Sequence, residues 1–240
     1  HQREKVDLCS PDGYDRNFRS SAWDQPTYFR TPPSASPPTS VGGRSNVGTA
    51  FFFNFAANGQ TYPVLVTNKH VIKDSTQAVL QVHVQGADGG PHPSDFVNIE
   101  VDKFESRWIP HPDADVDLAV MMGGPIINSV KADLGKTPFY RAFDESLLAP
   151  PAVVQDLTPV EDVLMVGYPI GIWDSVNNQP IVRRGITATD FKRDYEGRTQ
   201  FLIDAACFPG SSGSPVIHLP AVGGTFQLRT TFVGNTYYTT

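Results

Sequence analysis

The sequence predicts an all-β fold made of two halves, and three observations support this prediction. Proline and glycine are both abundant, at 21 and 20 of 240 residues, so the chain makes many turns between short elements. Apolar runs of strand length recur along the chain, and turn residues separate them. No amphipathic pattern is long enough for a three-turn helix. Two β-rich halves of similar size would pack as barrels or sandwiches with a cleft between them.

Composition divides the chain into an arm and a body. Residues 1–46 are polar and show little periodicity, and the segment "TPPSASPPTS" at 31–40 is typical of an extended linker. We therefore expect an irregular N-terminal arm or linker at 1–46 and one folded domain at 47–240. Within that domain, the first half covers about 47–125, a connection rich in Gly, Pro and Ala covers about 126–158, and the second half covers about 159–240.

The expected strands follow in order from residue 48. The first two flank Asn58-Gly59, a dipeptide that strongly favours a β-hairpin turn. The remaining runs of the first half are "AVLQVHV" (78–84), "FVNIEV" (96–101) and "VDLAVMM" (116–122). The runs of the second half are "DVLMVGYP" (162–169), "IVRRGITAT" (181–189), "TQFLIDAA" (199–206), "SPVIHL" (214–219) and "TFQLRTTFVG" (225–234).

Charge, hydropathy and cysteine count exclude several classes of protein. The net charge is −6 and no basic patch is visible, so we expect no nucleic-acid partner. No apolar run reaches the length of a membrane span. Cys9 and Cys207 could form at most one disulfide, so the chain is not a disulfide-stapled scaffold. The sequence begins without a signal-peptide hydrophobic region, which slightly favours a cytoplasmic location as an expectation.

The stretch "DAACFPGSSGSPVI" at 204–217 offers candidates for a nucleophile. A serine hydroxyl needs a base within hydrogen-bond reach and donors for the oxyanion that forms. In "PGSSG", Gly210 permits a turn that could aim the N–H groups of Gly210 and Ser212 at one point, with Ser212 as the nucleophile. Ser211 and Ser214 remain alternative nucleophiles, and a Gly/Ser/Pro cluster of this kind is often an ordinary loop.

The candidate base and its carboxylate both lie in the first half. Of the six histidines, His70 stands where the run "YPVLVTNKHVI" leaves the sheet, a place where a scaffold holds a side chain open to substrate. The others are His1, His83, His92, His111 and His218, of which two alternate within strands. Asp117 adjoins the apolar "LAV", where a charge is costly unless it is paired. We expect Asp113 and Asp115 to lie on a loop with their side chains in water.

These segments resemble those of chymotrypsin-fold (trypsin-like) serine peptidases. "VTNKHVI" resembles their His segment, "DVDLAVM" their Asp segment, and "PGSSGSPV" their nucleophile motif, in the same chain order. "DAACFPGSS", "MVGYPIG" and "RRGITAT" bring it closest to the bacterial trypsin-like, or Deg (high-temperature-requirement), type, without a PDZ domain. The resemblance implies two packed six-stranded antiparallel β-barrels and a catalytic triad of His70, Asp117 and Ser212.

The resemblance also implies a substrate pocket and an oxyanion hole. The oxyanion hole falls on the N–H groups of Gly210 and Ser212. The base of the primary pocket falls on Ala206, beside Cys207, where enzymes specific for Arg or Lys carry an Asp. The pocket wall falls on Gly234, Asn235 and Thr236. We therefore expect a small or medium apolar side chain in the substrate rather than Arg or Lys.

The sequence thus predicts a serine endopeptidase that acts on protein or peptide substrates through an acyl-enzyme. No cofactor and no metal is expected, since no Cys/His cluster has zinc-like spacing. The alternative is a catalytically latent or inactive peptidase-like module that binds peptide or partner proteins. A third reading, a β-sandwich adhesion domain with a chance motif match, would not need all three segments. A regulatory partner or a fused domain is compatible with either of the first two hypotheses.

Overall fold

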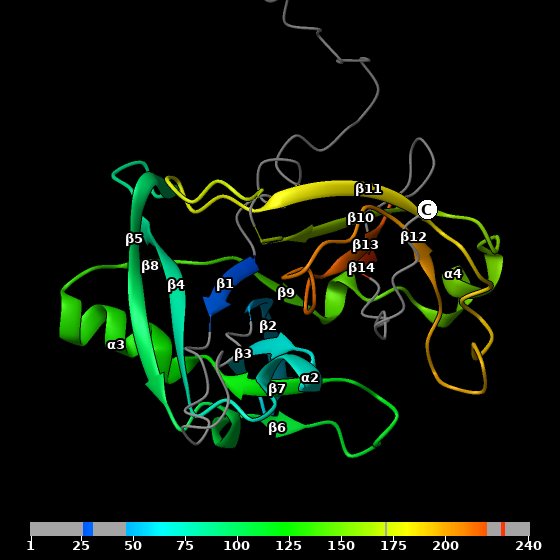
Figure 1. The fold of residues 1–240 in the computed structure, drawn as a ribbon, viewed down its shortest axis with the longest axis horizontal. Coiled ribbons are helices and arrows are strands. Elements are labelled where there is room, and N and C mark those ends of the chain that lie inside the picture. The colour runs from blue at the N-terminus through cyan, green and yellow to red at the C-terminus, as the bar shows by residue number, and fades with distance from the viewer. Residues whose placement is uncertain (1–25, 31–46, 171, 220–226, 229–240) are drawn as a thin grey trace, which may run out of the picture.

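The protein consists mainly of β-strands arranged in two sheets (Figure 1). The structure is a computed structural model and describes residues 26–30, 47–170, 172–219 and 227–228. The first sheet contains β1 (Pro26–Arg30), β2 (Val47–Ala57), β3 (Gln60–Thr67), β4 (Gln77–Gln85), β5 (Pro91–Asp102), β6 (Ile109–Pro110), β7 (Ala119–Met122), β8 (Pro138–Phe139) and β9 (Ala142–Asp144). The second contains β10 (Asp162–Gly167), β11 (Ile181–Thr187), β12 (Ile203–Asp204), β13 (Val216–His218) and β14 (Gln227–Leu228).

The all-β prediction is confirmed, although the strands are distributed differently from two six-stranded barrels. The first sheet runs in the order β5-β4-β1-β2-β3-β7-β6, with β8 added beside β4 and β9 added beside β2. The second sheet runs β12-β11-β10-β13-β14. The described strands therefore divide nine to five, and neither sheet closes on itself. Within the predicted strand at 199–206, only Ile203–Asp204 pairs in the sheet.

Three strands of the first sheet come from segments predicted as arm or connection. β1 lies within the predicted arm, and it is inserted between β2 and β4 with antiparallel pairing to both. β8 and β9 lie within the connection and pair with β4 and β2. Each of these strands has five residues or fewer, so their own sequences carry too little alternation to reveal them.

The expectation that the chain has no three-turn helix is wrong. α3 spans Gly124–Leu134, and its buried side chains are Ile126, Ile127 and Val130. Proline in its first turn and Gly135 at its end, with φ of 62°, are ordinary start and stop signals. Because only three residues of α3 are buried, its sequence shows too weak an apolar period to predict a helix. α3 lies at the left of Figure 1 and contacts β3, β5 and β8.

The two sheets share part of one hydrophobic core. Phe51, Val64 and Val66 of β2 and β3 pack with Val166 of β10 and Ile217 of β13. A larger cluster fills the first half alone, around Leu65, Leu80 and Trp108 among others. Shared apolar contacts of this kind fix one sheet against the other, so segments far apart in sequence keep a constant relation in space. The other helices of the described residues are short: α2 (Lys69–Ile72), α4 (Pro151–Asp156) and the 3-10 helices η1 (Glu105–Arg107) and η2 (Glu145–Leu147).

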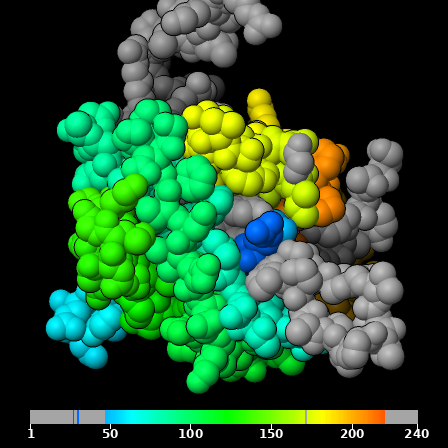
Figure 2. Space-filling model, turned by 60° about the vertical axis from the view of Figure 1, so that its left-hand side comes forward, coloured from blue at the N-terminus to red at the C-terminus, as the bar shows by residue number. Residues whose placement is uncertain are grey.

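A buried histidine forms a second link between the halves. His83 of β4 has a ring nitrogen, Nε2, 2.8 Å from the carbonyl oxygen of Asn178, which also accepts from the Tyr168 hydroxyl at 3.2 Å. Figure 2 shows the yellow surface of this part of the second half against the green surface of the first. Burial lowers the pKa of His83 below its ordinary 6.5, and the hydrogen bond to Asn178 acts in the opposite direction.

The lowered pKa of His83 predicts a pH dependence of stability. The unfolded chain takes up a proton near pH 6.5, whereas the folded chain resists it, so the free energy of unfolding should fall as pH drops below about 6.5. One proton can contribute at most about 1.4 kcal/mol per pH unit. Urea unfolding from pH 7.5 to 5 should show this loss, and His83→Gln should reduce it. An unchanged pH slope in His83→Gln would contradict the prediction.

Candidate active site

His70 lies on the one-turn helix that follows β3. The strand ends at Thr67, Asn68 begins the turn, and Val71 and Ile72 are buried beneath it. Burial of these two apolar side chains fixes the turn against the core. The His70 side chain keeps 33% of its surface exposed, so it is held by the scaffold and open to a ligand.

The Asp117 carboxylate contacts His70 at two points. Its Oδ2 lies 2.5 Å from Nδ1 of the imidazole, and its Oδ1 accepts a hydrogen bond from the backbone N–H of His70 at 3.0 Å. A carboxylate accepts only, so Nδ1 carries the proton and Nε2 is left as the basic nitrogen of the neutral ring. Asp113 and Asp115, on the same loop, are exposed, and the Asp113 carboxylate accepts from the N–H of Asp115.

The loop that carries Ser212 is bonded to the first half through Thr49 of β2. The N–H of Thr49 donates to the carbonyl of Ser212 at 2.9 Å, and the Thr49 hydroxyl donates to the carbonyl of Gly210 at 3.0 Å. The same hydroxyl oxygen accepts from the N–H of Tyr168, just after β10. Thr49 is fully buried, so these bonds are sheltered from water.

Asn68 joins the histidine turn, the Asp117 segment and the serine loop. Its Nδ2 donates to the carbonyl of Asp117 at 2.7 Å, and its Oδ1 accepts from the N–H of Gly213 at 2.6 Å. Asn68 is only two residues from His70, and Gly213 adjoins Ser212. One buried amide, two residues before His70, therefore bonds to the backbone of Asp117 and of the residue after Ser212. Neither Asn68 nor Thr49 was predicted as a site residue, because neither residue type signals such a bridge in the sequence.

Gly213 tolerates no side chain at this junction. Its φ is +83°, and a Cβ would overlap the carbonyl oxygen of Thr49 and crowd the Thr67 hydroxyl. Gly213→Ala should lower the free energy of unfolding by about 3 kcal/mol or more, from backbone strain together with overpacking. Gly197→Ala is the matched control, because Gly197 also has positive φ, at +71°, but open space around it. Urea unfolding that shows equal losses in both variants would contradict the steric argument.

The hydroxyls of the other two serines of the loop are buried in different ways. Ser211 is 5% exposed, and its Oγ accepts from a guanidinium N–H of Arg183 at 2.6 Å and from the N–H of Phe208 at 3.2 Å. The Oγ of Ser214 is inaccessible to water and lies against Gly167 of β10. Ser212 is half-buried.

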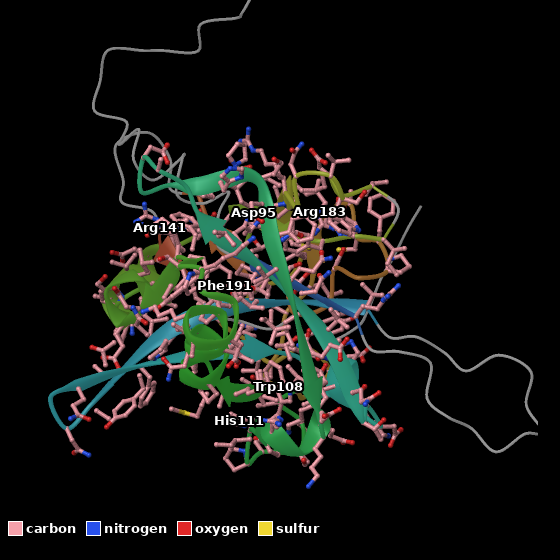
Figure 3. The ribbon with its side chains drawn as sticks, turned by 90° about the vertical axis from the view of Figure 1, so that its left-hand side faces the viewer. Asp95, Trp108, His111, Arg141, Arg183 and Phe191 are labelled. Atoms are coloured by element: carbon pink, nitrogen blue, oxygen red, sulfur yellow. The ribbon has the colours of Figure 1, made fainter. Side chains whose placement is uncertain are left out.

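A cleft of about 650 Å³ opens beside His70 and Asp117. Its walls come from both halves, as expected for a cleft between them. Trp108, labelled near the lower end of Figure 3, lines it from the first half, and Arg198 and Gln200 line it from the second. The other lining residues are Lys69, Ile72, Lys73, Glu105, Pro110, Ala114 and Asp115.

The predicted primary pocket is described only in part. Ala206 is exposed and Cys207 is half-buried with a free thiol. Gly234, Asn235 and Thr236 lie outside the described residues, as does Cys9. Burial raises the pKa of the Cys207 thiol, and the charge of Arg183 acts in the opposite direction. None of the helices in the described part of the chain has the length and apolar character needed to span a membrane.

The fold is an all-β architecture of two sheets with a cleft lined from both halves, and a family comparison gives the class of protein. A family model described as a trypsin-like peptidase domain matches residues 48–220. The chain therefore belongs to the trypsin-like peptidase family and is a serine endopeptidase. The bacterial Deg type and the role of each residue stay predictions.

Comparison with solved structures gives a more distant likeness. The chain is similar to the crystal structure of a thermostable serine protease, AL20, from an extremophilic microorganism. The two are 17% identical, with a TM-score of 0.46, and the match covers 91% of this chain and 88% of that chain. No curated protein matches the chain.

Proposed function

We propose that this serine endopeptidase uses His70, Asp117 and Ser212 as a catalytic triad and forms an acyl-enzyme. The observation that carries the proposal is the two-point contact of the Asp117 carboxylate with His70. It supports an imidazole held with Nδ1 protonated and Nε2 available as a base. The bonds of Asn68 to Asp117 and Gly213 are what we would expect if the serine loop docks beside that base.

The reaction follows from these roles. Ser212 Oγ attacks the carbonyl carbon of the substrate peptide as its proton passes to Nε2 of His70. The tetrahedral intermediate collapses when the C–N bond breaks and the imidazolium gives its proton to the leaving amine. Water then attacks the Ser212 ester with His70 again as base, which releases the carboxylic acid and restores the hydroxyl. Asp117 stabilises the imidazolium at each stage.

The oxyanion hole is proposed at the N–H groups of Gly210 and Ser212. Two backbone hydrogen bonds indicate the direction in which these two N–H groups point. The carbonyl of Pro209 accepts from the N–H of Ile170 at 2.8 Å, and the carbonyl of Ser211 accepts from the N–H of Ser214 at 3.0 Å. In a trans peptide, the N–H points opposite to the carbonyl of the preceding residue. The N–H groups of Gly210 and Ser212 are therefore turned away from Ile170 and Ser214.

The choice of Ser212 over its neighbours rests on burial. The Oγ of Ser211 is buried and bonded to Arg183, and the Oγ of Ser214 has no access to water. A nucleophile must meet a substrate carbonyl, which neither of those positions allows.

For the substrate, we propose a small or medium apolar side chain at the scissile bond. Ala206 offers no negative charge, and the buried Arg183 cation near it disfavours Arg or Lys.

A fluorophosphonate probe tests the proposed nucleophile. The wild-type chain should be labelled at one site, and mass spectrometry should place the adduct on Ser212. Ser212→Ala should abolish labelling, whereas Ser214→Ala should retain it as the matched control. Labelling that persists in Ser212→Ala would move the nucleophile to another serine. A folded wild-type chain that takes no label would favour the latent, peptide-binding module instead.

A further inference from the structure

A buried arginine contacts the turn that precedes the proposed nucleophile. Arg183 is 7% exposed, and it lies in the upper part of Figure 3, far from Trp108. Its NH1 group donates to the Oγ of Ser211 at 2.6 Å and to the carbonyl of Ala206 at 3.0 Å. These two acceptors are five residues apart, so one guanidinium spans the turn from its start to the residue before Ser212.

The arginine is held by a regular strand. Arg183 lies on β11, which pairs with β10 on one side and β12 on the other, and it stands opposite Met165 of β10. The pairing with β10 continues on either side of Arg183, from Ile181 to Ile186, whereas β12 pairs only at Ile186 and Thr187. The guanidinium therefore fixes the turn to the second sheet, just as Thr49 fixes it to the first.

Inside the turn, the same hydroxyl organises the backbone. The Oγ of Ser211 accepts from the N–H of Phe208 at 3.2 Å, and the N–H of Ser211 donates to the carbonyl of Phe208 at 3.0 Å. Residues 208–211 are thus closed into one compact turn. Gly210 sits at its tip with a φ of +89°, a conformation that other residues rarely adopt.

Burying a guanidinium carries a desolvation cost, so its contacts at this place call for a role. We propose that Arg183 is a positioning residue for catalysis, which holds Gly210 N–H in the direction that receives the oxyanion. It acts through Ser211 Oγ and the carbonyl of Ala206, and it touches neither substrate nor reacting atoms. This inference rests on the proposed function, because it assigns the oxyanion donors to Gly210 and Ser212.

The inference predicts a loss of turnover with little loss of substrate binding. Arg183→Met and Ser211→Ala should each lower kcat for an ester or peptide substrate by ~10- to 100-fold, less than or equal to the loss of a whole oxyanion donor. KM should stay within about threefold, since uniform binding is not removed. The double variant should match the single ones, because both break the same contact. Arg183→Lys, which keeps a donor, should fall between them and the wild type.

The neighbouring arginine is the matched control. Arg184 is on the same strand, but its side chain is 68% exposed and pairs with Asp162 on the surface. Arg184→Met should retain kcat within about twofold, as expected for a surface pair. Hydrogen exchange should rise in the peptide 204–214 of Arg183→Met and not of Arg184→Met. This readout reports the order of the turn without any catalysis.

The outcomes separate this inference from the proposed function. A folded Arg183→Met with kcat and hydrogen exchange like wild type would overturn the role of Arg183 alone. So would a double variant whose losses multiply. If Arg183→Met does not fold, Ser211→Ala and Arg183→Lys decide by the same kcat and KM criteria. If the folded wild type and Arg184→Met both fail to react with the fluorophosphonate at Ser212, the proposed function falls and this inference falls with it.

Discussion

Ser212→Ala is expected to lower kcat/KM by about 10⁵- to 10⁶-fold, the largest effect of any substitution considered for this protein. The change removes the hydroxyl proposed as the nucleophile, whereas the Oγ of Ser211 is bonded to Arg183 and the Oγ of Ser214 is inaccessible to water. Any residual hydrolysis would come from binding and the oxyanion donors acting on water. Steady-state hydrolysis of an ester or peptide substrate measures the loss, with a thermal melt to show that the fold is intact.

The control for that prediction is Ser214→Ala, in which a buried hydroxyl against Gly167 is removed. Its activity should stay within a few-fold of wild type, because the Oγ has no path to substrate. Ser212→Ala with more than about 1% of wild-type activity, measured on protein free of contaminating protease, would refute Ser212 as the nucleophile, since triad members carry far larger factors.

Asp117→Asn is expected to lower kcat by about 10⁴-fold near neutral pH. An amide can present only one accepting oxygen to His70, whereas the carboxylate accepts from both the backbone N–H and Nδ1–H. If the amide NH2 faces the ring, Nδ1 must become the acceptor, and the proton moves to Nε2. The ring is then in the wrong tautomer to act as a base.

The matched control is Asp115→Asn, two residues earlier on the same loop. Asp115 is exposed, and it lines the cleft without reaching His70 in any described contact. Its kcat should remain within about twofold of wild type. Equal losses in the two variants would show that the loop's charge, rather than the contact with the imidazole, governs activity.

The sequence could predict the chemical groups of the site but not the bonds that bring them together. His70 and Asp117 were readable because each stands at the end of an apolar run, where a polar side chain on a strand end is conspicuous. The contact between them is present, with both carboxylate oxygens used. Asn68, Thr49 and Arg183 were not readable, since their partners are backbone groups or hydroxyls up to 163 residues away that only the folded chain brings close.

For the fold, long strands with clear alternation could be predicted from the sequence, whereas very short strands could not. Strands with several alternating residues, such as β4 and β10, lie within a residue or two of the predicted runs. β1, β8 and β9 are strands because they pair with β2 or β4. A local sequence pattern does not predict such pairing with a distant strand. α3 was overlooked because only three of its residues reach the core.

The most direct test of the triad is to trap the acyl-enzyme. The protein is mixed with an activated ester, quenched in acid within the first turnovers, and analysed by mass spectrometry of the intact chain and its peptides. One acyl group on Ser212, formed in wild type and lost in both Ser212→Ala and His70→Ala, is the expected result. Hydrolysis of the ester with no adduct on Ser212, or an adduct that forms at the wild-type rate in His70→Ala, would contradict the assignment of His70, Asp117 and Ser212 as one catalytic unit.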